Sequence, residues 1–176
     1  MSIVFDEPVL ADAEEIARVH VQCWQESYAG ILPDEFLRKL SADARVAQWQ
    51  KAISDPDVFV RAARDAGRIV GFLSCGSARE DAAKEADGEF FAIYILEAFH
   101  GRKIGRSLIA AAARFWLSKG GRNLVVLSMA GNTQASAFYE ALGGVQVYEG
   151  SFEIAGTRMA EKGHIFRNLA DLAAHA

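Results

Sequence analysis

The sequence predicts one α/β domain, spanning residues 1–176, with a mixed, mostly antiparallel sheet of about seven strands and flanking helices. Three observations predict this class. Helical and strand-like segments alternate along the chain, without a repeat or an interdomain linker. A continuous apolar run at 124–127 is typical of a central strand buried on both faces. An alanine-rich helical segment at 104–118 separates that run from another apolar strand at 89–96, which predicts one crossover unit.

The N-terminal segment is expected to form a strand and then a helix. Residues 2–10 are predicted to form the first strand, ended by Pro8. Asp12 followed three residues later by Glu15 fits a capping box. Apolar residues at helical spacing then predict a helix that runs to Ser27.

Two further helices are expected before the second strand. Pro33 suits the first position of one helix, and Ser41 suits the cap of the next. The pair at 55–56, Asp-Pro, stops the last of them. The helices of this part of the chain are therefore expected over about residues 11–53.

The middle of the chain predicts a hairpin followed by the crossover. Strands are expected at 57–64 and 68–76, joined by Asp-Ala-Gly at 65–67. The polar stretch 78–88 is expected to be an exposed loop.

The end of the chain predicts a helix and two strands. Glycines at 120–121 end the helix at 104–118. A short helix is expected at 133–142, stopped by two glycines, and the last strands at 145–148 and about 152–167.

Composition limits the class of protein and its partners. Hydrophobic residues make up 51% and charged residues 24% of the chain, as in average globular domains. No apolar run approaches the roughly 18 residues of a membrane span, and no secretory signal is readable. Cys23 and Cys75 lie far apart and outside metal-ligand spacing, so we expect buried thiols in a reducing, cytoplasmic compartment.

The charge is distributed unevenly. The formal net charge is −4, which argues against nucleic acid as a partner. Between residues 98 and 139, however, six basic residues and no acidic ones occur. This local positive field indicates an anionic ligand bound at one place, although a solvated basic helix face would give the same pattern.

The turn that enters the alanine-rich helix is the strongest candidate for such an anion site. Residues 97–106 leave a strand, pass two glycines and begin a helix, which exposes backbone N–H groups at a helix N-terminus. Arg102, Lys103 and Arg106 add positive charge. The turn is neither a P-loop nor a dinucleotide-binding loop, because the glycine and lysine spacings differ.

Two segments resemble the GNAT superfamily of N-acetyltransferases. Residues 92–108 resemble its acetyl-CoA loop, Gln/Arg-x-x-Gly-x-Gly/Ala after a strand. His100 stands where Gln or Arg is usual, Lys103 stands where the first glycine is usual, and Gly105 matches the last position. Residues 132–143 resemble the family's Asn-x-x-Ala-x-x-Phe-Tyr-x-x-x-Gly segment, which is the more specific match.

The resemblance implies that acetyl-CoA is a co-substrate bound to the crossover at about 89–142. The central strand pair would be splayed, with the pyrophosphate on the turn at 101–106 and the pantetheine arm along the strand. The cofactor-binding residues implied are Ile93, Ile95, His100, Gly101, Arg102, Lys103, Ile104, Gly105, Arg106, Asn132 and Phe138.

The resemblance also implies catalytic and acceptor-binding residues. Tyr139 would protonate the departing thiolate, Glu89 would act as general base, and Trp24 and Tyr28 would bind the acceptor. A base is useful because a lysine-like amine, of pKa about 10.4, is neutral in roughly one molecule in 2,500 at pH 7, a gap of about 4.6 kcal/mol. Attack would be direct, in a ternary complex, since neither cysteine lies where a covalent acetyl carrier is expected.

Each of these residues also has a purely structural interpretation. Tyr139 also fits a packed aromatic beside Phe138, and Glu89 also fits a solvated charge at a strand end. Asn132 fits a helix cap, which is compatible with ligand binding. Trp24 and Tyr28 are either core aromatics or walls of the acceptor pocket.

The sequence therefore predicts an acetyl-CoA-dependent N-acetyltransferase acting on a primary amine of a small molecule or peptide. The alternative is a non-catalytic acyl-CoA-binding or regulatory module on the same fold, which the departures at His100 and Lys103 keep open. No metal, nucleic acid or membrane partner is expected, and His20 and His164 are expected to be structural. The resemblance also implies a homodimer, because dimers are common in the family.

Overall fold

Seven strands form one sheet in the computed structural model, which describes residues 2–79 and 84–174. The strand order is β1-β2-β3-β4-β5-β7-β6, and every neighbouring pair is antiparallel except β4 and β5, which are parallel. The predicted class, a mostly antiparallel sheet with one crossover, is confirmed. The crossover helix connects the two parallel strands, as parallel pairing requires.

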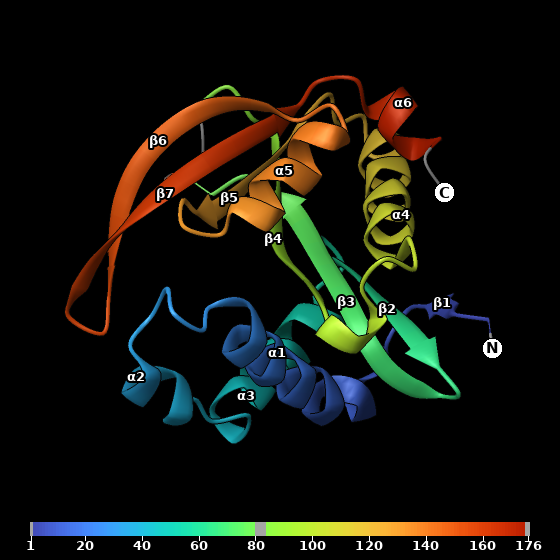
Figure 1. Ribbon diagram of the computed structural model, residues 1–176. Helices are drawn as coiled ribbons and strands as arrows, with labels where there is room; N and C mark the ends of the chain where they lie inside the picture. Colours follow the sequence, from blue (N-terminus) through green and yellow to red (C-terminus); the bar gives the residue numbers. More distant parts are fainter. Residues whose placement is uncertain (1, 80–83, 175–176) are drawn as a thin grey trace.

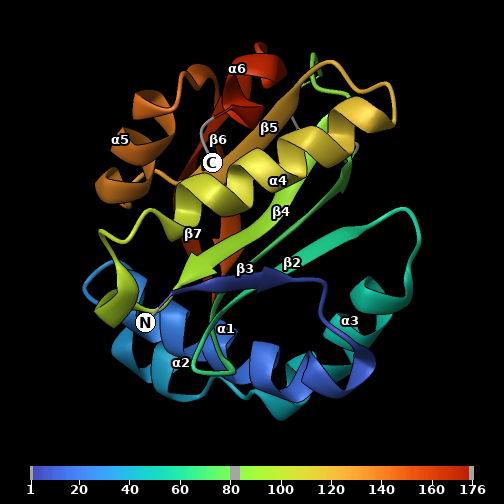
Figure 2. The same cartoon turned by 90° about the vertical axis from the view of Figure 1, so that its right-hand side faces the viewer.

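Helices cover both faces of the sheet (Figure 1). The strands are β1 (Val4–Asp6), β2 (Phe59–Asp65), β3 (Arg68–Ser77), β4 (Gly88–Ile95), β5 (Leu124–Met129), β6 (Val145–Ile154) and β7 (Thr157–Phe166). The α-helices are α1 (Ala13–Ser27), α2 (Asp34–Arg38), α3 (Asp43–Ser54), α4 (Ile104–Ser118), α5 (Thr133–Ala141) and α6 (Leu169–Ala173), with short 3₁₀ turns at Leu10–Asp12 and Glu97–Phe99. Helices α1–α3 lie on one face, and α4–α6 lie on the other, with α4 running alongside β4 (Figure 2).

Each face has its own apolar core. On one face, Leu108 and Trp116 of α4 pack against Leu73 and Phe90 of the sheet. On the other face, Ile16 of α1 and its neighbours pack against β2 and β3. Both cysteines are buried in these cores, and burial raises the pKa of the Cys23 and Cys75 thiols to about 12. The predicted buried thiols are confirmed.

The predicted N-terminal strand and helix cap are corrected by the structure. The strand ends at Asp6, before Pro8, and residues 10–12 form a 3₁₀ turn. The Asp12 carboxylate does not cap α1; it accepts the Val9 N–H at 2.8 Å and an Arg64 N–H at 2.9 Å. In the bond to Arg64 both groups are charged, whereas a cap would pair the carboxylate with a neutral N–H, so the long-range partner prevails.

The middle elements match the expectations closely. The turn between β2 and β3 has left-handed residues at Ala66 (φ 47°) and Gly67 (φ 82°), as a two-residue hairpin requires. The Ser41 hydroxyl accepts the Ala44 N–H at 3.4 Å, while Pro33 precedes α2 instead of occupying its first position. Part of the predicted loop at 78–88, residues 80–83, lies outside the described residues.

The C-terminal strands differ from the prediction in their boundaries. Strand β6 continues to Ile154, and the chain turns at Ala155 and Gly156, both with positive φ. The single strand expected at about 152–167 therefore begins only at Thr157, and the short helix α6 was not predicted. Alanine at a left-handed turn position gives no sequence signal for the turn, which explains the error.

Candidate active site

The central strands β4 and β5 are paired at one end and separated at the other. They form a parallel ladder through only three pairs, Gly88–Leu124, Glu89–Val125 and Phe90–Val126. Beyond Phe90, β4 continues to Ile95 beside β3, and β5 continues to Met129 beside β7. The splayed strand pair that the resemblance implied is confirmed, and it leaves backbone groups of β4 facing an opening.

A bulge in β4 lies where the strands separate. Ser74 pairs with Ala92 and Cys75 pairs with Phe90, so Phe91 has no partner in β3. The extra residue reverses the alternation of side chains along the strand. Before the bulge Phe90 faces the α4 side; after it, Ile93 and Ile95 do, while Ala92 and Tyr94 face α1.

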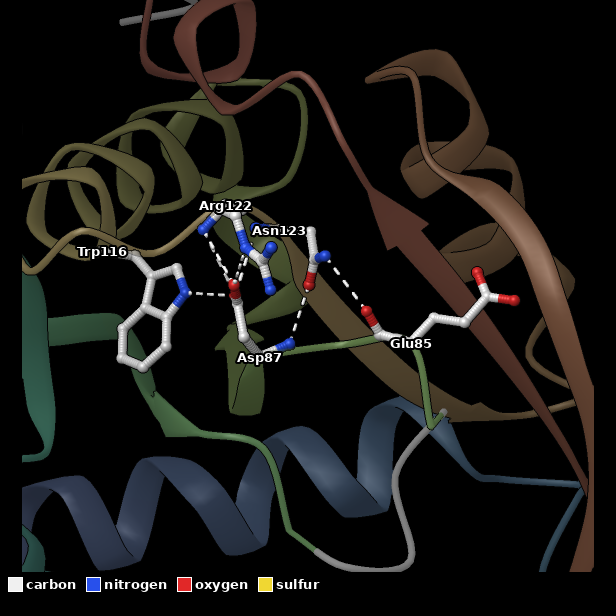
Figure 3. Close-up of polar contacts among 5 residues, drawn as sticks. All are labelled: Glu85, Asp87, Trp116, Arg122 and Asn123. Atoms are coloured by element: carbon white, nitrogen blue, oxygen red, sulfur yellow. Dashed lines mark hydrogen bonds and ion pairs between the residues drawn. The ribbon is translucent and has the colours of Figure 1, made fainter.

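The paired end of these strands, which we term the closed end, is held by a polar network around Asp87 (Figure 3). The Asp87 carboxylate accepts hydrogen bonds from the Trp116 indole at 3.0 Å and from the backbone N–H groups of Arg122 and Asn123 at 3.1 and 3.2 Å. The Asn123 side chain accepts the Asp87 N–H and donates to the Glu85 carbonyl. Burial raises the pKa of Asp87, but these hydrogen bonds outweigh it and lower the pKa below its ordinary value.

The opposite end, which we term the open end, contains a pocket of about 370 Å³. Side chains from β4, β5, α4 and α5 line it, and its volume is in the range of ligand-binding pockets. Twelve of the predicted site residues line this pocket: Tyr28, Ile93, Ile95, His100, Gly101, Lys103, Ile104, Gly105, Arg106, Asn132, Phe138 and Tyr139. The structure thus brings both motif segments to one place.

The N-terminus of α4 opens into this pocket. Gly101 (φ 76°) and Lys103 (φ 62°) both adopt left-handed conformations in the turn before it. Within the described chain no side chain caps α4, so its first N–H groups, at residues 104–106, are available to an anion. Lys103 holds, at a cost of about 1–2 kcal/mol, a conformation that glycine adopts freely. This explains why a glycine is usual at this position in the resembling pattern.

Two other residues of the turn contact the protein itself. A His100 ring nitrogen, Nε2, lies 2.8 Å from the Ile95 carbonyl oxygen and ties the turn to the end of β4. The Arg102 guanidinium lies over the Phe99 ring at 4.8 Å and does not line the pocket. The charges that face the pocket from this turn are therefore Lys103 and Arg106.

Helix α5 places Asn132 and Tyr139 on the pocket wall. The Asn132 Oδ1 accepts the Ala135 N–H at 3.1 Å, so the residue is a helix cap, and its amide NH₂ group makes no hydrogen bond with any described residue. Tyr139 is 5% exposed, and its hydroxyl likewise has no hydrogen-bond partner in the described ranges. Burial and the nearby Tyr28 raise the pKa of Tyr139 well above 10, so its phenol keeps its proton at neutral pH.

Glu89 lies apart from the pocket. It is fully buried at the closed end, where Arg79 donates through Nε to both carboxylate oxygens, at 3.1 and 3.0 Å, and through its backbone N–H at 3.1 Å. An ion pair of this kind occupies the lone pairs that a general base needs. The structure does not bring Glu89 to Tyr139, and its role as base stays a prediction.

On the α1 side, Tyr28 reaches the pocket and Trp24 does not. The two rings pack edge to face with centroids 5.1 Å apart, and the Arg45 guanidinium covers the Trp24 ring at 4.9 Å. Trp24 therefore supports Tyr28 from behind, and only the tyrosine forms part of the wall.

Tyr94, which also lines the pocket, was not predicted from the sequence. Its hydroxyl lies 3.3 Å from the hydroxyl of Tyr28, and burial raises its pKa well above 10. A tyrosine in a strand that is otherwise apolar was the available signal, but the bulge at Phe91 hid the face to which it points. Ser27, Phe91 and Gln134 are further wall residues that the sequence did not indicate.

No helix among residues 2–79 and 84–174 is long and apolar enough to cross a membrane. Over the same ranges, no group of three or more His, Cys, Asp or Glu side chains is arranged to hold a metal ion.

Comparison with known proteins agrees with this geometry. The model of the acetyltransferase (GNAT) family matches residues 14–144. The chain belongs to the GNAT family. A Bacillus subtilis relative described as an uncharacterized N-acetyltransferase, YuaI, is 37% identical over 157 residues, covering 89% of this chain and 88% of the relative.

Solved GNAT structures share the fold across nearly the whole chain. The PaiA N-acetyltransferase of Thermoplasma acidophilum, solved with coenzyme A, is 20% identical, with a TM-score of 0.69 over 92% of this chain and 98% of its own. YncA of Salmonella typhimurium, solved with acetyl-CoA, is 18% identical, with a TM-score of 0.73 over 95% and 94% of the two chains. The protein is thus an acyltransferase with the GNAT fold.

Proposed function

We propose that this protein transfers the acetyl group of acetyl-CoA to a primary amine of a small molecule or peptide, by direct attack in a ternary complex. The observation that carries the proposal is the open end: unpaired β4 backbone lies beside an uncapped helix N-terminus, in one pocket with Tyr139. Unpaired backbone and uncapped N–H groups need water or a ligand as a partner, so a pocket that gathers them is suited to a polar ligand.

The pocket fits acetyl-CoA part by part. The N–H groups of residues 104–106, with Lys103 and Arg106, suit the pyrophosphate. The opening between β4 and β5 suits the pantetheine arm, whose amides match the free backbone of β4 and the free amide of Asn132. Two GNAT neighbours were solved with coenzyme A or acetyl-CoA, which supports the same ligand here.

The transfer forms an N–C bond and breaks the C–S bond of the thioester. The Ile95 N–H polarises the thioester carbonyl as the neutral amine attacks. Tyr139, protonated at neutral pH, gives its proton to the departing thiolate, and the nitrogen's surplus proton restores the phenol. The products are the acetylated amine and coenzyme A, with Tyr139 unchanged.

The test combines binding with turnover. Calorimetry with acetyl-CoA should show micromolar binding, and thiol release should depend on an added primary amine. Tyr139→Phe should lower kcat about 100-fold and leave the affinity for acetyl-CoA unchanged, because only the proton donor is lost. Tyr148→Phe, on β6 and outside the pocket, is the matched control and should change neither quantity.

Two outcomes would contradict the proposal. Absence of binding at millimolar acetyl-CoA would remove the ligand from the open end. Thiol release by Tyr139→Phe at the wild-type rate would remove its role as proton donor. A companion variant, Glu89→Gln, tests the general base. Glu89 has this role only if the variant lowers kcat while its unfolding free energy and its affinity for acetyl-CoA stay at the wild-type values.

A further inference from the structure

Two tyrosine hydroxyls meet at the α1 side of the pocket. Tyr28 comes from the end of α1 and Tyr94 from β4, and their oxygens lie 3.3 Å apart. Both residues line the pocket. We term them the tyrosine pair; the resemblance implied Tyr28 as an acceptor-binding residue but did not imply Tyr94.

Aromatic neighbours fix the pair in place. The His20 ring packs against the Tyr94 ring with centroids 4.9 Å apart, and Trp24 packs edge to face on Tyr28. His20 is itself held by the Trp49 indole, which donates to its Nδ1 at 3.2 Å. The positions of the two hydroxyls are therefore set by packing and do not depend on their mutual hydrogen bond.

The pair faces Tyr139 across the opening. After the bulge, Ile93 and Ile95 point to the α4 side and Tyr94 points between them to the α1 side. Tyr139 reaches the same pocket from α5. The phenols are close enough to influence one another, since Tyr28 raises the pKa of Tyr139, and Tyr28 and Tyr139 raise that of Tyr94. A molecule between them would contact both faces.

The hydrogen-bonding capacity of the pair is only partly used. Two hydroxyls carry two hydrogens and several lone pairs, and their mutual bond uses one hydrogen and one lone pair. Burial keeps both phenols neutral at pH 7, so each oxygen still accepts a hydrogen bond without carrying charge. These are the properties required to hold a neutral amine by its hydrogens.

We propose that the tyrosine pair binds the acceptor as a neutral primary amine, with each hydroxyl oxygen accepting one N–H, so that the nitrogen lone pair points toward the thioester carbon. Once the N–C bond has formed, one of the two N–H protons leaves its tyrosine oxygen for the Tyr139 phenolate. This inference rests on the proposed acetyl transfer. It assigns Tyr94 as a substrate-binding residue and predicts a preference for primary over secondary amines. A secondary amine has a single N–H and leaves one oxygen without its bond.

The experiment uses the full chain with acetyl-CoA and phenethylamine, benzylamine and n-butylamine, each beside its N-methyl derivative. Thiol release gives kcat and KM for wild type, Tyr94→Phe, Tyr28→Phe, the double variant and the control Tyr148→Phe. Each single change should lower kcat/KM for the primary amine about tenfold, with the loss in the acceptor KM. The KM of acetyl-CoA should not change.

Coupling separates this role from a purely structural one. Both hydroxyls hold the same amine. The fold loss in kcat/KM of the double variant should therefore be smaller than the product of the fold losses of the two single variants. The variants should also have a smaller ratio of kcat/KM for the primary amine to kcat/KM for its N-methyl derivative than wild type has. Phenylalanine keeps the packing of each ring, so thermal unfolding midpoints near wild type are expected and are checked first.

The outcomes are distinguishable. If wild type turns over the primary amines and Tyr94→Phe keeps kcat/KM within twofold, the tyrosine pair does not bind the acceptor and acetyl transfer stands. If the variants lose affinity for acetyl-CoA instead, the pair belongs to the cofactor site and the inference is wrong. If wild type binds acetyl-CoA but releases no thiol with any amine, the proposed transfer and the amine site are both refuted.

Discussion

At the closed end of the β4–β5 pair the strands are joined by ladder bonds, and the Asp87 carboxylate accepts N–H groups from the chain that enters β5. At the open end the same two strands part, and the N–H groups of α4 point into a pocket without a side-chain cap from the described chain. The closed end satisfies its polar groups with hydrogen bonds inside the protein. The open end leaves backbone N–H groups available to a ligand.

The packing of the closed end explains how the fold tolerates an opening at the other end of the same strands. Trp116 fills the closed end so tightly that a Cβ atom on Gly88 would lie 2.4 Å from its indole, and one on Gly121 would lie 2.1 Å from it. Packing and hydrogen bonds there fix the separation of the strands. The open end then keeps its shape without ladder bonds between β4 and β5, which is the preorganisation that binding requires.

The same substitution at the two ends should break two different properties, and this is the largest effect that we expect. Gly88→Ala should lower the unfolding free energy by about 3 kcal/mol, because the new methyl group overlaps the buried Trp116 ring. A Cβ atom on Gly105 would lie 2.9 Å from the end of the Phe138 side chain. The higher helix propensity of alanine offsets the loss of stability that this crowding causes. Gly105→Ala should weaken acetyl-CoA binding about tenfold, or 1.4 kcal/mol, with little loss of stability.

Denaturant unfolding and calorimetry on both variants measure these two effects. If Gly105→Ala unfolded as easily as Gly88→Ala, the open end would be as structural as the closed end, and the contrast between them would be lost.

Charge at the closed end gives an effect of intermediate size that depends on pH. Asp87→Asn should lower the unfolding free energy at pH 7 by about 1.5 kcal/mol, since hydrogen bonds to a carboxylate become neutral ones. The folded-state pKa of Asp87 is lowered, so its contribution is present above the unfolded value of 3.8 and is lost as the pH falls through the folded value.

Unfolding curves of wild type and Asp87→Asn should therefore converge at the acid limit. A difference that stayed constant from pH 7 to pH 2 would show that the carboxylate charge plays no part at the closed end.

The smallest expected effect sharpens the description of the open end. Lys103→Gly should raise the unfolding free energy by up to about 1 kcal/mol, because glycine adopts the left-handed conformation at φ 62° without strain. The salt dependence of acetyl-CoA binding should become weaker, since one cation is removed. Lys103→Ala separates the two effects: it loses the charge but keeps the strain, so it should show the binding change without the gain in stability.

Most of the fold was predictable because local signals and burial agree. The helix at 104–118 and the hairpin at 65–67 were predicted at their observed positions, since alanine-rich periodicity and an Asp-Ala-Gly turn are local features. One error concerns the left-handed turn at Ala155, which gives no local signal, and another concerns a distant partner. Asp12 was predicted to cap α1, and Arg64, far away in sequence, binds it instead.

The candidate site was predictable where a motif marks it. Residues from both segments, 100–106 and 132–139, line one pocket, as the resemblance implied, with Arg102 turned outward onto Phe99. The sequence did not indicate Tyr94, whose orientation depends on a bulge, or the Arg79 partner of Glu89, which only the paired strands bring into contact. Both depend on strand register, which a single sequence leaves open.

The bulge at Phe91 also restricts how this enzyme is able to change over evolutionary time. It sets which side chains of residues 92–95 face α4 and which face α1. A point substitution there alters one face of the strand and leaves the other intact. Insertion or deletion of one residue between Phe91 and Ala92 would exchange the two faces of residues 92–95 at once. The length of this segment is therefore expected to stay constant while its side chains diverge, so new acceptors would arise by substitution alone.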